Sequence, residues 1–157
     1  QIQSPHCRRA PRPPHRHIQV NSGPTPTSST FPLYGALTAQ VIDALPVLAA
    51  IAPYTANGLI IRDAQELRVK ESDRIVLVAR NLAAMGATFT EHPDGLEIPG
   101  NQSLHGAQID SGADHRIAMA FAIAALRASG DTEIQGAEAA SISFPEFFTS
   151  LDALALR

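Results

Sequence analysis

The feature that most constrains the fold is a change of composition near residue 33. Residues 1–32 hold seven of the twelve prolines and contain no apolar run long enough to form a core. Residues 1–42 carry four arginines and no acidic residue, whereas the other eight basic residues and all fifteen acidic ones give the rest of the chain a net charge of −7. Because such a proline-rich segment cannot offset the entropy lost on ordering, we predict that residues 1–32 are disordered or extended and that residues 33–157 fold.

The basic, proline-rich segment of residues 1–32 has three open interpretations. It resembles a solvated or non-native leader, which we favour. Its arginines, serines and lack of acids also fit an organelle transit peptide, although it begins with Gln1 and shows no amphipathic helix. A nucleic-acid-binding arm fits less well, because no aromatic residue lies between the arginines and the rest of the chain is acidic. We therefore expect no nucleic-acid partner.

Several classes of protein are excluded by composition. The most apolar stretches, residues 44–53 and 117–126, are about half as long as the roughly 20 residues that a membrane-spanning helix needs. Cys7 is the only cysteine, so the chain is no disulfide scaffold, and its proline- and arginine-rich surroundings do not suggest a catalytic thiol. The six histidines show no metal-binding spacing, and we expect no metal.

From Leu33 onward the sequence alternates between helix and strand signals. Apolar residues recur at spacings of three and four in the helical stretches, and glycine, proline or asparagine separates the stretches. The pattern predicts, in order, a helix at 43–52 capped by Asp43, a strand at 59–61, a helix that begins near Ser72 or Asp73 and ends at Gly86, strands at 87–90, 96–98 and 104–109, a helix from Asp114 to Gly130, a strand at 132–135, and a last helix capped by Ser143 with Pro145 in its first turn.

These predicted elements repeat along the chain. A shift of 71 to 73 residues places the helix start at Asp43 on that at Asp114, and the strand at 59–61 on the one at 132–134. The sequence therefore indicates one helix-strand-helix-strand-strand unit followed by a truncated copy. This order favours an α+β architecture over a Rossmann sheet, and neither GxGxxG nor GxxxxGK[ST] occurs.

Two helix starts gather charged side chains. The segment ELRVKESDR at residues 66–74 precedes one apolar helix, and the segment DHR at residues 114–116 begins another. Backbone N–H groups at a helix start favour anions, and arginine matches a carboxylate or phosphate in two-point contact. Each segment alone fits ordinary caps and solvated charges. Together they place an arginine beside a titratable group, Glu71 or His115, as a site that binds an anion and moves a proton requires.

Four segments carry a resemblance to a known family. IDALPVLA (42–49), ELRVKESDRI (66–75), DHRIAMA (114–120) and SFPEFF (143–148) resemble, in order and spacing, signature segments of the 5-enolpyruvylshikimate-3-phosphate synthase family. The match covers about residues 37–157. It implies an enolpyruvyl transferase-like inverse α/β barrel of repeated βαβαββ units, with about two units of one domain present. The related transferase acting on UDP-N-acetylglucosamine shares the fold but lacks the LRVKESDR block.

The resemblance implies a reaction and its ligands. The family transfers the enolpyruvyl group of phosphoenolpyruvate to the 5-hydroxyl of shikimate 3-phosphate, releases phosphate, uses no metal or organic cofactor, and is the target of glyphosate. By resemblance, Asp43 contacts the shikimate hydroxyls and is a candidate proton acceptor, and Glu71 handles protons at the phosphoenolpyruvate methylene. Lys70 contacts the shikimate substrate. Arg74 and Arg116 clamp the phosphoenolpyruvate carboxylate, and His115 and Asp114 support that loop.

The chain also departs from the family pattern. Ile142 stands where many members have lysine, Ala113 where glycine or asparagine is usual, and Glu66 where some members have asparagine. The family enzyme has two domains, and the first, which carries further phosphate-binding residues, has no counterpart here. We therefore expect a truncated homologue that is weak or inactive alone and that needs an N-terminal half or self-association. We expect it in a bacterial cytoplasm, or in a plastid if residues 1–32 are a transit peptide. The alternatives are a stand-alone binding protein for glyphosate or phosphoenolpyruvate, conferring glyphosate tolerance, and a purely structural remnant.

Overall fold

The computed structural model describes residues 31–155, so the predictions for residues 1–30 lie outside the described residues. Phe31 and Pro32, which the sequence analysis assigns to the proline-rich segment, belong to a strand. The strands are β1 (Phe31–Leu33), β2 (Leu59–Ile61), β3 (Thr90–His92), β4 (Gly95–Ile98), β5 (Gln108–Asp110) and β6 (Glu133–Gln135). The α-helices are α1 (Gly35–Gln40), α2 (Leu45–Ile51), α3 (Arg74–Ala84), α4 (His115–Ala125) and α5 (Phe147–Ala155). The 3₁₀ helices are η1 (Ile42–Ala44), η2 (Ala52–Tyr54), η3 (Gln65–Val69) and η4 (Ala137–Ile142).

The strands form two small sheets. The first has the order β1-β2-β4-β3, in which β1 and β2 are parallel and the other pairs are antiparallel. The second contains β5 and β6, which are parallel. Each parallel pair is connected through helical segments, by α1 and α2 in the first sheet and by α4 in the second. This mixture of sheets and helices confirms the α+β class.

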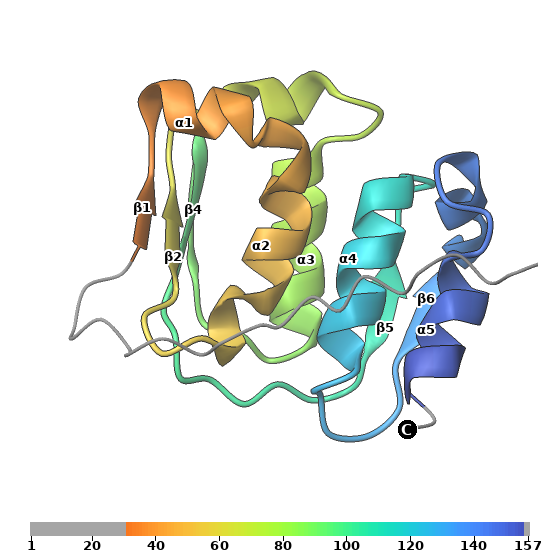
Figure 1. Ribbon diagram of the computed structural model, residues 1–157. Coiled ribbons are helices and arrows are strands. Elements are labelled where there is room, and N and C mark those ends of the chain that lie inside the picture. The colour runs from red at the N-terminus through yellow and green to blue at the C-terminus, as the bar shows by residue number, and fades with distance from the viewer. Residues whose placement is uncertain (1–30, 156–157) are drawn as a thin grey trace, which may run out of the picture.

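The core lies where the helices pack between the two sheets. Figure 1 shows α2, α3 and α4 between the sheet of β1, β2 and β4 and the pair β5–β6. The predicted apolar face of α3 is confirmed, because Ile75, Val78, Leu82 and Met85 are almost completely buried. Full burial of each such side chain is worth about 1.5–3 kcal/mol. This packing holds α3 against its neighbours, which include α2, α4 and β5. Among residues 31–155, no helix is long and apolar enough to cross a membrane.

Two of the four predicted helix caps are confirmed. The Asp73 carboxylate accepts a hydrogen bond from the Val76 amide at the start of α3, and the Asp114 carboxylate accepts one from the Arg116 amide at the start of α4. These side chains satisfy backbone N–H groups that have no partner within the helix. Both charged segments therefore begin at fixed helix starts.

The predicted caps Asp43 and Ser143 are wrong. Asp43 lies inside η1, and α2 begins after Ala44 without a side-chain cap. Ser143 instead ends η4, and α5 begins at Phe147, after the predicted first-turn residue Pro145. The amides of Ser143 and Phe144 both donate to the Ala140 carbonyl, so these residues continue the turns of η4 and do not begin the last helix.

Two predicted strands are displaced. The strand expected at 87–90 is β3 at Thr90–His92, because the Ala87 amide donates to the Leu82 carbonyl and so belongs to the end of α3. This backbone hydrogen bond closes a turn past Gly86, whose φ is +81°. The strand expected at 104–109 is replaced by the shorter β5. Of the residues expected before β5, only His105 forms an isolated bridge, with Ser129.

Candidate active site at two facing helix starts

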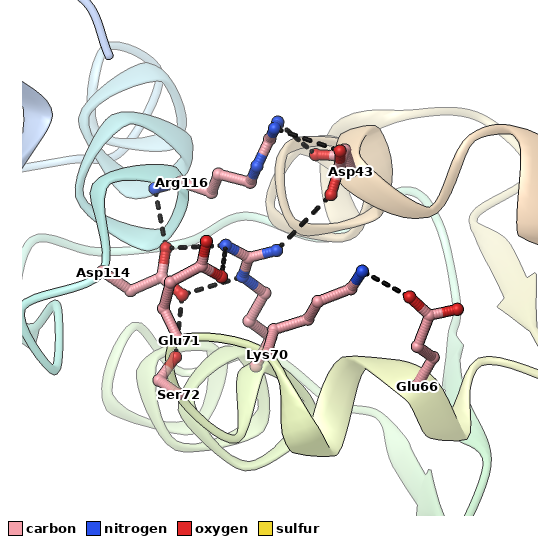
Figure 2. Close-up of polar contacts among 8 residues, drawn as sticks. Asp43, Glu66, Lys70, Glu71, Ser72, Asp114 and Arg116 are labelled. Carbon is pink, nitrogen blue, oxygen red and sulfur yellow. Dashed lines mark hydrogen bonds and ion pairs between the residues drawn. The ribbon is translucent and has the colours of Figure 1, made fainter. Parts of the chain in front are cut away.

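Arg74 and Arg116 are brought together by the caps of their helices. Arg74 is the first residue of α3 and directly follows the capping Asp73, and Arg116 is the second residue of α4, two positions after the capping Asp114. Because α3 and α4 pack in one core, these starts face each other although they lie about 40 positions apart in the sequence. Figure 2 shows the side chains from both starts converging with Asp43 of η1.

The Arg74 side chain is buried and surrounded by three carboxylates. Its Nε donates to Asp114 Oδ2 at 2.7 Å and its Nη2 to Glu71 Oε2 at 2.5 Å. Its Nη1 lies 3.6 Å from Asp43 Oδ1. Only 1% of the side chain is exposed, and a guanidinium is kept charged at such burial only when it is paired. The sequence allowed a surface position for Arg74 as one alternative, and the structure excludes it.

Asp114 is the most tightly held of these carboxylates. It is almost fully buried and accepts hydrogen bonds from Arg74, from the Ser72 hydroxyl at 2.9 Å and from the Arg116 amide at 2.9 Å. Burial by itself would raise the pKa of Asp114, but these hydrogen bonds outweigh it, and the pKa lies below its ordinary value. The hydrogen bonds thus favour the ionised form of Asp114, whose carboxylate fixes the orientation of Arg74.

Asp43 joins the two arginines from the other side. Its carboxylate Oδ2 lies 3.2 Å from Arg116 Nη2, and its backbone carbonyl accepts from Arg116 Nη1 at 2.9 Å. About half of the Asp43 side chain and a third of the Arg116 side chain are exposed. Asp43 therefore does not cap α2, because its carboxylate pairs with guanidinium groups instead of backbone amides.

A hollow opens beside this pair. Its volume is about 190 Å³, and its lining contains two charged residues and six apolar ones. The lining residues are Asp43, Pro46, Val47, Arg116, Met119, Ala120, Ile123 and Phe147. A small anion that reaches Arg116 therefore has room next to it.

The other expected site residues lie at the edge of the cluster. Glu71 contacts Arg74 and leaves about half of its side chain exposed. Lys70 follows the end of η3, and its ammonium group pairs with Glu66 instead of entering the cluster (Figure 2). His115 is half-buried as the first residue of α4. Of the seven expected residues, the structure brings five into one network: Asp43, Glu71, Arg74, Asp114 and Arg116.

Sequence reasoning missed one member of this network. Ser72 stands directly before the capping Asp73 and looks like part of an ordinary helix start. Its hydroxyl instead donates to Asp114 of the other helix start. Only the packing of α3 against α4 reveals this contact.

The arrangement contains the groups that anion binding and proton transfer require. Two guanidinium groups converge on one point, and the half-exposed carboxylates of Asp43 and Glu71 lie beside them. Such carboxylates act as general acids or bases when a substrate is held against them. Within residues 31–155, no group of three or more His, Cys, Asp or Glu side chains is arranged to hold a metal ion.

Comparisons with known proteins identify close relatives in sequence. The sequence model of the family described as EPSP synthase (3-phosphoshikimate 1-carboxyvinyltransferase) matches residues 25–151. The 3-phosphoshikimate 1-carboxyvinyltransferase of Koribacter versatilis is 61% identical over 124 residues, which cover 79% of this chain and 29% of the relative. The enzyme of the same name from Solibacter usitatus is 58% identical over 121 residues, covering 77% of this chain and 28% of the relative.

Solved structures show the same relationship. An EPSP synthase from Acinetobacter baumannii matches with a TM-score of 0.74 and 37% sequence identity over 81% of this chain and 30% of that chain. The fold is therefore that of the enolpyruvyl transferases. The chain spans less than a third of the length of these relatives.

Proposed function

Because the chain belongs to the EPSP synthase family, we propose that it supplies the phosphoenolpyruvate-binding part of an active site that transfers an enolpyruvyl group to shikimate 3-phosphate in the shikimate pathway. The observation that carries the proposal is the convergence of Arg74 and Arg116 on Asp43, with Glu71 beside them. The relatives contain a further two thirds of sequence that this chain does not span. We therefore expect the chain alone to bind phosphoenolpyruvate but to turn over weakly or not at all.

We propose that the two arginines clamp the carboxylate of phosphoenolpyruvate. Arginine presents a planar pair of N–H donors that fits a carboxylate in two-point contact. Arg74 is held rigidly by Asp114, and Arg116 is open to the neighbouring hollow, so a ligand carboxylate displaces the exposed Asp43 rather than the buried Asp114. In this proposal His115 supports the same helix start.

The chemistry then needs three proton transfers. The substrate hydroxyl attacks C2 of phosphoenolpyruvate, and its proton passes to Asp43. Glu71 delivers a proton to the methylene carbon, which becomes a methyl group, and the Glu71 carboxylate then takes a proton back from this carbon while the C–O bond to phosphate breaks and the vinyl group is restored. The Lys70 ammonium group leaves its ion pair with Glu66 and contacts the shikimate substrate. Each step is general acid–base chemistry by a positioned carboxylate and uses no metal.

We further propose that the described part is built from about two βαβαββ units of one domain, and that the non-homologous segment ends before residue 25, where the family match begins. The first unit runs from β1 to β4 and the second from β5 to α5. Both begin with a parallel strand pair that is connected through helical segments, which supports the repeat. Arg74 and Arg116 then lie at the helix starts of successive units.

The experiment is a phosphate-release assay with both substrates, run on the chain alone and together with the separately expressed remainder of a relative. An NMR titration with phosphoenolpyruvate accompanies it. We expect shifts at Arg74 and Arg116, and phosphate release only with the remainder present. Arg80→Gln, in an exposed ion pair elsewhere, is the control and leaves binding unchanged. Binding without turnover in the mixture would favour a stand-alone binding protein for phosphoenolpyruvate or glyphosate, and absence of shifts at both arginines would refute the proposal.

A further inference from the structure

Arg68 is the most extensively hydrogen-bonded arginine outside the cluster among the described residues. Its Nε donates to the Pro93 carbonyl at 2.7 Å, and its Nη2 donates to the His92 carbonyl at 2.9 Å and to Glu91 Oε1 at 3.0 Å. Its Nη1 donates to both carboxylate oxygens of Asp73, at 3.3 and 3.1 Å. All three nitrogens are thus engaged, and hydrogen bonds with Glu91 and Asp73 raise the pKa of Arg68 despite partial burial.

These contacts close a short loop. The ion pair between Arg68 and Asp73 joins the two ends of residues 68–73, and Lys70 and Glu71 lie between those ends. Asp73 also caps α3, whose first residue is Arg74. The same guanidinium therefore ties the loop both to the helix start and, through Glu91 and its neighbours, to the hairpin of β3 and β4.

The geometry argues against a direct role of Arg68 in anion binding. About three quarters of its side chain is buried, and its donors face carbonyls and carboxylates of the protein. Arg116, in contrast, borders the hollow. Lysine cannot reproduce the contacts of Arg68, because one ammonium group cannot reach three partners in a planar fork.

We propose that Arg68 is a positioning residue that holds the loop 68–73 so that Glu71 stays against Arg74 and Lys70 stays at the edge of the site. The inference rests on the proposed function for the roles of Glu71 and Lys70. The contact that it explains is the ion pair between Glu71 Oε2 and Arg74 Nη2.

The test compares Arg68→Met with Arg68→Lys and with the control Arg62→Met in the full chain. Arg62 pairs with Asp94 at the tip of the same hairpin, at 3.2 Å, but does not contact the loop 68–73. Two quantities are measured by NMR: the solvent exchange rate of the Arg74 side-chain N–H groups without ligand, and the Kd for phosphoenolpyruvate. We expect Arg68→Met to accelerate the Arg74 N–H exchange about tenfold and to raise the Kd for phosphoenolpyruvate about tenfold. The loss of charge-assisted hydrogen bonds typically has an effect of this size.

Rescue separates positioning from general destabilisation. Arg68→Lys recovers part of both effects, and Arg62→Met changes neither even where it lowers the midpoint of unfolding. If Arg68→Met does not fold, Glu91→Gln removes one anchor and produces smaller changes in the same direction. Unchanged Arg74 exchange in the Arg68 or Glu91 variants, or equal changes in Arg62→Met, overturns the inference. If the unaltered chain shows no phosphoenolpyruvate shifts, the proposed function fails, and the exchange rate still decides whether Arg68 positions Glu71.

Discussion

Replacing Asp114 by asparagine tests how the buried part of the site is held together. The substitution keeps the shape of the side chain but removes the negative charge. Arg74 then loses its closest fully buried partner, since both side chains are at most 1% exposed. The remaining ion-pair partners of Arg74 are Glu71 and Asp43, and the side chain of each is more than half exposed.

The expected cost follows from this geometry. Removal of one partner of a buried ion pair costs about 3–5 kcal/mol, because the other charge stays buried without compensation. Glu71 still contacts Arg74 at 2.5 Å, and the asparagine oxygen can still accept from the Arg116 amide. We therefore expect Asp114→Asn to lower the free energy of unfolding by about 2–4 kcal/mol.

Urea unfolding of the chain, followed by circular dichroism, measures this loss. Arg80→Gln breaks the ion pair with Asp110, in which both side chains are about half exposed, and is expected to cost about 0–1 kcal/mol. Replacing both Asp114 and Arg74 by apolar residues of similar size should cost less than the sum of the single changes. An Asp114→Asn variant that is no less stable than Arg80→Gln would refute the claim that Asp114 fixes Arg74.

Two further predictions concern the same helix start. Because the pKa of Asp114 is lower in the folded state, the Asp114 carboxylate stabilises the fold above the ordinary pKa of 3.8, and this stabilisation is lost as the pH falls through the lower native pKa. The difference in free energy of unfolding between the unaltered chain and Asp114→Asn should therefore shrink below about pH 4, as measured by urea titrations. Ala113 has a φ of +56°, a conformation that favours glycine, so Ala113→Gly should raise the free energy of unfolding by about 0.5–1 kcal/mol; a lower urea midpoint for that variant would contradict this account.

The sequence predicted best what depends on local pattern. The buried face of α3 follows from apolar spacing alone, and the caps Asp73 and Asp114 follow from short polar side chains at the start of apolar runs. Asp43 had the same local signature and yet is no cap, because Arg116, 73 positions away, offers its carboxylate a charged partner. The Ser72 contact likewise depends on helix packing. Sequence patterns thus indicated which residues carry charge, but the pairing partners depend on contacts between distant segments.

The pairing pattern also decides which carboxylate gives way to a substrate. The network of Asp43, Glu71 and Asp114 around Arg74 and Arg116 has three negative charges and two positive ones, so an added anion must displace a carboxylate. Release of Asp114 costs several kcal/mol, whereas an ion pair of a half-exposed carboxylate is worth about 0–1 kcal/mol. Asp43 is the half-exposed carboxylate that pairs with Arg116 at the hollow. In the proposed reaction, binding of phosphoenolpyruvate therefore releases Asp43 from the arginines and leaves this carboxylate beside the ligand, where it accepts the proton of the attacking hydroxyl.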